Sequence, residues 1–422
     1  MSNRKAIFSL FLNIGSNVFS QILIVIFIPI LARIYKPEDF ALATLFLGVA
    51  SCFVSISSLR LSVTIPIAEN KEEKGRALVL SASIVILLSL LFFIFSKTWP
   101  IFDDIGLGKY KNVIFAYMMV LSFNSILTGV IISSGNYNFI GGSKVLTSVV
   151  LNFSRLFISY AGLSSGLIYS LIISEVIAFF VLLYGSRTAI KNYTLNHKFV
   201  KKDYVLFIRK YKDYPKYQVL SQFVLISSQY APVFMMSKSY SAMQIGFFVM
   251  ANNLVSMPVN SIGLALSQIY LGEYRKQEKR RKIFKHSIFI VLLFMISSLP
   301  FVFILYIWGE SIVEFILGEQ WKKAAPLISM LIFLGAAKLC MAVISQSLNI
   351  FKAQKLQLGI NILFFFSSYL SLYAGIYYKF DFDSTVLSYT VFGSVALLIG
   401  VILTLRNIKI NSTDNEVIYK KY

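Results

Sequence analysis

Twelve apolar stretches, each long enough to cross a bilayer, constrain this chain more than any other feature of its sequence. They span Phe8–Leu31, Phe40–Ile65, Ala77–Phe95, Asn112–Ser133, Ser143–Ala161, Gly166–Tyr184, Tyr217–Met236, Ile245–Ser267, Ser287–Trp308, Ala324–Phe351, Leu356–Tyr377 and Ser384–Leu405. Hydrocarbon offers no hydrogen-bond partner to an open backbone, so stretches of this length must be helical. The sequence therefore predicts an all-α integral membrane protein with 12 transmembrane helices.

The composition agrees with a membrane protein and argues against an enzyme. Only 14% of the 422 residues are charged, against about 25% in soluble domains. The connections are too short to fold as a catalytic domain, and there is no P-loop, dinucleotide fingerprint or metal-ligand cluster. Cys52 and Cys340 both lie in predicted helices. We therefore expect no enzyme activity, catalytic residue, metal, cofactor or disulfide.

The basic residues predict the orientation of the chain. Its net charge is +21, and Lys and Arg gather in the amino terminus, the even-numbered connections and the tail. This bias places both termini in the cytoplasm, and it explains the charge without nucleic acid. Trp99, Trp308 and Trp321 then fall at the outer interface, which aromatic rings prefer.

The two halves of the chain echo each other weakly. Tyr35 and the Phe40-Ala41 start of the second segment correspond to Tyr240 and Ile245-Gly246, as expected for a duplicated transporter. We predict an N-terminal six-helix lobe (1–185), a basic cytoplasmic linker (186–215), a C-terminal six-helix lobe (216–405) and a cytoplasmic tail (406–422). The linker reads either as a solvated connector or as a surface for lipid headgroups or a partner protein.

Amide side chains recur inside several apolar segments. Asn13, Asn17 and Gln21 share one face of the first segment because they are four residues apart. Gln222 lies in the seventh segment, and Asn253 and Asn260 lie in the eighth. Lipid cannot satisfy these groups, so they either join helices or line a polar cavity. We favour the cavity for these three segments.

Four ionisable residues also lie within the segments: Arg60, Arg155, Glu175 and Lys338. A charge near the bilayer centre costs about 2.5–3.5 kcal/mol on insertion scales, so each is a functional candidate. Lys338 is the preferred anion contact. Arg60 is either a substrate ligand or a snorkelling side chain. Arg155 and Glu175 form an ion pair, or Glu175 couples transport to a proton or sodium gradient.

The central part of the sequence resembles a known family. The pattern comprises Asp213-Tyr214-Pro215-Lys216-Tyr217, Ala231-Pro232, Gly246-Phe247, Ala251-Asn252, Pro258, Ile262-Gly263 and Ser267-Gln268. It is similar to the signature of Wzx-type polysaccharide flippases, whose superfamily includes multidrug extruders and lipid II flippases. Phe315-Ile316-Leu317-Gly318-Glu319-Gln320-Trp321 resembles the family's outer loop, and Arg33 matches its first turn, where it guards or caps the outer mouth.

The resemblance implies two pseudo-symmetric six-helix lobes around a central cationic cavity in the bacterial inner membrane. It implies a flippase that moves undecaprenyl-pyrophosphate-linked oligosaccharide, an O-antigen or capsule repeat unit, to the periplasmic leaflet by alternating access. Membrane lipids, and the polymerase and chain-length regulator of the same pathway, would be its partners. An ion-coupled multidrug antiporter and a membrane polysaccharide polymerase are the alternatives. Three buried cations against one acid disfavour the antiporter, because cationic drugs call for an acidic cavity.

Overall fold

The computed structural model describes residues 3–98, 100–163, 165–195, 200–212, 214–274, 282–351 and 353–419, and these contain helices and no strands. The main helices of the first half are α1 (Asn3–Ile34), α2 (Pro37–Ser57), α3 (Lys71–Thr98), α5 (Lys111–Ser134), α6 (Asn138–Tyr160), α7 (Gly166–Leu195) and α8 (Lys201–Lys210). Those of the second half are α9 (Val219–Met236), α10 (Ala242–Tyr274), α11 (Ile283–Leu317), α12 (Ala325–Ile344), α14 (Gln354–Tyr377) and α15 (Phe382–Tyr419). Two short helices, α4 (Ile101–Asp104) and α13 (Gln346–Ile350), lie in connections.

Ten helices of the described chain are long and apolar enough to cross a membrane. The described apolar part of α1, Val18–Ile34, is shorter, and α6 lies outside the ten because it carries polar residues such as Lys144 and Arg155. The helical membrane architecture predicted from hydropathy is confirmed. The count of twelve stays a prediction.

The chain divides into two compact units. Unit 1 contains residues 1–35 and 42–230, and unit 2 contains residues 36–41 and 231–422. The boundaries fall inside α2 and α9, so each of these helices contributes to both units. The predicted lobes, linker and tail were defined by segment counting and stay a prediction.

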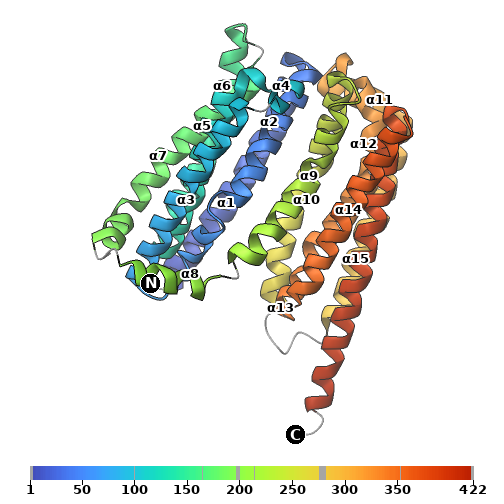
Figure 1. The fold of residues 1–422 in the computed structure, drawn as a ribbon. Helices are drawn as coiled ribbons and strands as arrows, with labels where there is room; N and C mark the ends of the chain where they lie inside the picture. The colour runs from blue at the N-terminus through green and yellow to red at the C-terminus, as the bar shows by residue number, and fades with distance from the viewer. Residues whose placement is uncertain are drawn as a thin grey trace. The chain divides into compact units, whose positions relative to one another are not determined.

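In unit 1, α6 packs on α1 and α7, while α5 packs on α3 and α7 (Figure 1). In unit 2, α12 packs on α10, α11 and α15, and α14 packs on α15. Only 6% of the apolar window of α11 is buried inside the protein. Because α11 is apolar on all sides, we infer that most of its surface faces lipid.

Residues of the family signature pack together in unit 2. The buried Trp321 ring lies edge-on to Phe40, with ring centroids 5.4 Å apart, and to Phe247 at 6.1 Å. A Cβ on Gly246 would lie 2.1 Å from the carbonyl oxygen of Pro37, so only glycine fits there. Trp321 is thus a packing residue whose ring is shielded from the headgroup zone. Trp308 is 54% exposed, and Trp99 lies outside the described residues.

The two tyrosines that suggested duplication make corresponding contacts. The Tyr35 hydroxyl donates to the carbonyl oxygen of Arg155 near the end of α6, at 2.6 Å. The Tyr240 hydroxyl donates to the carbonyl oxygen of Phe380 between α14 and α15, at 2.9 Å. Each tyrosine therefore ties the turn after the first helix of its half to the junction before the last helix of that half. These corresponding contacts give a structural reason for the similarity between the two halves of the sequence.

Candidate substrate cavity

A cavity of about 780 Å³ lies within unit 1. Its polar lining comes from six helices and the turn after α2: Ser20, Gln21, Ser51, Ser55, Ser58, Arg60, Ser62, Asn124, Ser125, Thr128, Ser143, Lys144, Thr147, Ser148, Glu175 and Gln222. Hydroxyl groups and amides dominate this lining, and two cations and one carboxylate accompany them. Such a surface can solvate a charged, hydroxyl-rich ligand without water.

Arg60 occupies a break in the helix that was predicted to continue to Ile65. The helix α2 ends at Ser57, and a 3-10 turn follows at Leu61–Thr64. The Ser55 and Ser57 hydroxyls bond to the carbonyl oxygens of Cys52 and Val54, which helps the last turn to end there. The predicted continuous helix is therefore wrong at this end.

The backbone at the break is strained. Leu59 has φ 46° and Arg60 has φ 58°, both in the left-handed region that non-glycine residues avoid. Each such residue costs on the order of 1–3 kcal/mol, and strain of this kind is often kept where it serves function. Arg60 also has a buried Nε without a hydrogen-bond partner. A guanidinium with an unsatisfied Nε at the cavity wall is suited to an anionic ligand.

Glu175 is held by an amide rather than by a cation. The Asn124 Nδ2 donates to Glu175 Oε2 at 2.8 Å and to the Glu175 carbonyl oxygen at 3.0 Å. Arg155 lies on the preceding helix, α6, and was the expected partner of Glu175. Its Nε instead donates to Ser170 Oγ at 3.4 Å. The described residues contain no ion pair between Arg155 and Glu175. Among the described residues, the Glu175 side chain is therefore bound by an amide and forms no ion pair.

Four predicted site residues meet in this cavity: Gln21, Arg60, Glu175 and Gln222. The others that the structure describes lie elsewhere. Arg33 is exposed on the last turn of α1, and Asn253 and Asn260 are exposed on α10. The side chains of Asn13 and Asn17 are outside the described residues.

Lys338, the cation predicted to be the main anion contact, does not line this cavity. It lies half-buried in the unbroken helix α12, and its Nζ is 5.9 Å from the centroid of the Phe364 ring. That geometry is a cation–π contact. Lys338 forms no ion pair among the described residues. Its role as an anion contact stays a prediction.

Lys144, Asn124 and Thr128 are among the polar lining residues that sequence reasoning missed. A usable signal was present for each of them. Lys144 is one turn before Ser148, so it extends the polar stripe of α6 that also includes Asn152. Asn124 and Thr128 are four residues apart on α5 and thus share a face.

Comparison with known proteins identifies a family and a shared fold. A family model described as polysaccharide biosynthesis protein matches residues 11–326. The chain therefore belongs to that family. Comparison with curated protein sequences gives no match.

Solved structures of transporters share the fold. The lipid II flippase MurJ, in an inward closed conformation, is 15% identical and has a TM-score of 0.70, with 96% of this chain and 92% of that chain covered. An inward-facing multidrug resistance MATE family transporter of the MOP superfamily is 15% identical, with a TM-score of 0.67 and 94% of each chain covered. A mutant of the Vibrio cholerae MATE transporter VcmN is 14% identical, with a TM-score of 0.58 and 94% and 96% covered. The protein thus has the MurJ- and MATE-like transporter fold.

Proposed function

We propose that this protein is a flippase for undecaprenyl-pyrophosphate-linked oligosaccharide, which it moves from the cytoplasmic to the periplasmic leaflet. The observation that carries the proposal is the unit 1 cavity, whose hydroxyls, amides and two cations match a phosphorylated glycan. Membership of the polysaccharide biosynthesis family and the fold shared with a lipid II flippase support it. An O-antigen or capsule repeat unit is the expected cargo.

The chemistry of the cargo defines what such a protein must do. A pyrophosphate crossing about 30 Å of hydrocarbon would lose solvation worth tens of kcal/mol. A polar cavity lowers that barrier without covalent chemistry, while the polyprenyl chain stays in the lipid. Alternating access would then expose the cavity to each leaflet in turn.

Arg60 and Lys144 are the proposed pyrophosphate contacts in unit 1. Both line the cavity, and the strained backbone and buried Nε of Arg60 support a role in binding an anion. The amides of Gln21 and Gln222 and the serine hydroxyls would bind the sugar hydroxyls. Arg155 and Lys338 stay proposed as additional contacts on the route, and Arg33 as a residue of the outer mouth.

Glu175 is the proposed coupling residue. Its carboxylate lines the cavity and is bound by Asn124 instead of a cation, so it is able to exchange a proton or bind sodium. A proton or sodium gradient would then drive transport. We place the protein in the bacterial inner membrane with both termini cytoplasmic, next to the polymerase and chain-length regulator of the same pathway.

The test measures lipid-linked oligosaccharide in the outer leaflet. Sealed vesicles with and without the protein receive an impermeant enzyme that acts on exposed glycan. We expect exposure that depends on the protein, that is lost in Arg60→Ala, and that is kept in Arg406→Ala, a matched change at an exposed arginine of α15. Equal exposure in vesicles lacking the protein would refute flipping.

A multidrug antiporter is the second candidate. The fold shared with MATE transporters favours it, as does a carboxylate in the cavity, because cationic drugs need an acidic partner. The same vesicles decide between the two. Drug uptake against an ion gradient, without glycan exposure, would establish the antiporter. A polysaccharide polymerase is the third candidate, and it would lengthen the glycan instead of relocating it.

A further inference from the structure

The short helix α8 (Lys201–Lys210) contributes no residue to the lining of the cavity. It follows α7 in the chain and lies outside the ten membrane-spanning helices. Figure 1 shows it lying across the end of the unit 1 helices instead of running beside them. The basic connections predict that this end is the cytoplasmic one.

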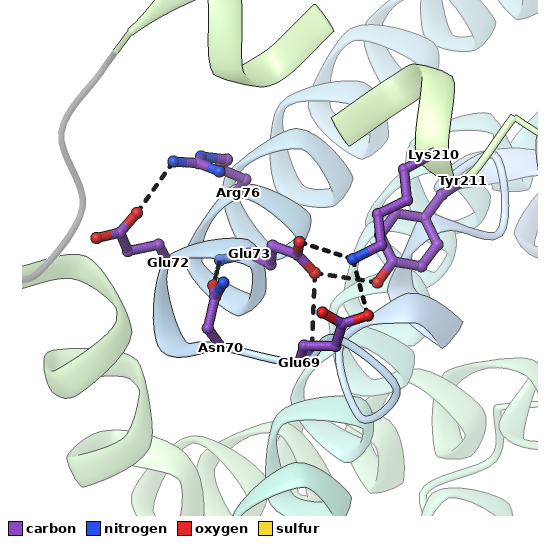
Figure 2. Close-up of polar contacts among 7 residues, drawn as sticks. All are labelled: Glu69, Asn70, Glu72, Glu73, Arg76, Lys210 and Tyr211. Carbon is purple, nitrogen blue, oxygen red and sulfur yellow. Dashed lines mark hydrogen bonds and ion pairs between the residues drawn. The ribbon is translucent and has the colours of Figure 1, made fainter. Parts of the chain in front are cut away.

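Ion pairs hold one edge of α8 to the start of α3. Lys210 Nζ lies 2.8 Å from Glu73 Oε1 and 3.1 Å from Glu69 Oε1 (Figure 2). The Tyr211 hydroxyl donates to the other oxygen of Glu73 at 3.1 Å. Asp203 is the acidic residue of α8 and could repel an anion, but it forms an ion pair with Arg76. The Arg76 Nη2 lies 2.8 Å from Asp203 Oδ2.

Apolar packing fixes the rotation of α8 about its axis. Phe207 and the adjoining Tyr211 are buried in the same core cluster as Leu61, Ile65 and Ala77. Tyr204 is buried on the same side, three residues before Phe207. With one edge paired and one side packed, the outward face of α8 is defined.

That outward face combines apolar and basic residues. Val205, Leu206 and Ile208 are 43–53% exposed, and Lys202 and Arg209 are exposed beside them. Residues at these three- and four-residue spacings are neighbours on a helix, so the five form one continuous surface. It carries no acid, because Asp203 lies on the paired edge.

We propose that this outward face of α8, defined by these five residues, rests in the headgroup layer of the membrane and binds anionic phospholipid. The apolar side chains enter the boundary between headgroups and acyl chains, and Lys202 and Arg209 reach the phosphates. Water is a poor environment for three exposed aliphatic side chains, and the positive charge complements an anionic leaflet. The inference does not depend on which cargo the protein moves.

A depth-sensitive label tests the proposal. Cysteine replaces Val205 in a Cys52→Ala, Cys340→Ala background, and an environment-sensitive fluorophore is attached to it. The protein is reconstituted in phosphatidylcholine vesicles with or without phosphatidylglycerol, and lipids brominated in the acyl chain act as quencher. A label at Leu91, which is 53% exposed on the spanning helix α3, reports full lipid contact. A label at Lys71, exposed at the start of α3, reports the aqueous end.

We expect the Val205 label to be quenched at least half as strongly as the Leu91 label in vesicles with phosphatidylglycerol. Lys202→Gln with Arg209→Gln should reduce that quenching at least twofold there, and less in phosphatidylcholine alone. Quenching no stronger than at Lys71 would overturn the proposal. Equal quenching with and without phosphatidylglycerol would overturn its anionic part. A water-soluble quencher is tested on the same Val205 label. If neither this quencher nor the brominated lipid quenches the label, a second copy of the chain covers the outward face, and the proposal is overturned.

Discussion

Arg60 in unit 1 and Lys338 in unit 2 are both cations predicted inside the membrane, yet their surroundings in the structure differ. Arg60 lies at a broken helix end, in a left-handed conformation, on the wall of a polar cavity. Lys338 lies in a continuous helix, between the buried residues Ala337 and Cys340 in the chain, and over the ring of Phe364. Arg60 has strain and an unsatisfied donor, whereas Lys338 has an aromatic neighbour. Depth in the membrane alone therefore does not define a ligand site.

The largest effect should come from Arg60. A hydrogen bond to a charged group contributes about 1.5–3 kcal/mol, so Arg60→Ala should lower the transport rate roughly 10- to 150-fold. Arg60→Gly should lose transport equally but raise the melting temperature, because glycine accepts positive φ without strain. Transport is measured by glycan exposure, and stability by thermal unfolding in detergent. Full transport in Arg60→Gly would mean that the guanidinium group of Arg60 is not a ligand of the cargo.

Glu175 should show the next largest effect. Glu175→Gln removes the titratable group but keeps its size, so transport should fall about tenfold and lose most of its dependence on pH. Asn124→Leu should weaken transport less and leave it dependent on pH, since the carboxylate remains. Initial rates measured across pH in both variants distinguish coupling from positioning. An unchanged pH profile in Glu175→Gln would remove this residue from coupling.

Lys338 should matter less than Arg60. The cation–π contact of Lys338 with Phe364 contributes about 0.5–2 kcal/mol. Because methionine keeps most of the packing, we expect the transport rate of Lys338→Met to fall less than about tenfold. If Lys338 were the main anion contact, as the sequence alone favours, Lys338→Ala would instead abolish transport. A loss in either variant as large as that in Arg60→Ala would erase the difference between the two regions and make Lys338 a main anion contact.

The smallest effect concerns the ion pairs that hold α8. The Glu73 and Glu69 carboxylates raise the pKa of Lys210 above its ordinary value. The contribution of a raised pKa is complete below the ordinary lysine pKa and is lost only as pH rises through the folded value. Lys210→Met should therefore lower the melting temperature by roughly 2 °C at pH 7 and less above about pH 11. Lys212→Met, at an exposed neighbour, serves as the control. A difference in melting temperature between Lys210→Met and the unchanged protein that grows as pH rises would contradict this account.

Hydropathy was sufficient to predict the helical membrane architecture, and the resemblance of the signature residues to a known family predicted the transporter fold. Burial in lipid is a property of each segment, because every backbone group in the hydrocarbon must find its partner within the same helix. Gly246 and Trp321 of the signature, and Phe40 of the echo between the two halves, were recognisable for a related reason. Phe40 packs against Trp321 and Gly246 packs against Pro37, so the sizes of these residues are restricted in the sequence.

The tertiary structure decided which polar residues share a site. It ended α2 at Ser57, placed Arg60 on a cavity with Lys144, and joined Glu175 to Asn124 instead of Arg155. The sequence determined that these side chains stand on membrane helices, since periodicity is local. The residues that share the cavity come from helices that lie far apart in the sequence. Only the packing of those helices determines which polar groups of equal depth and similar chemistry become neighbours.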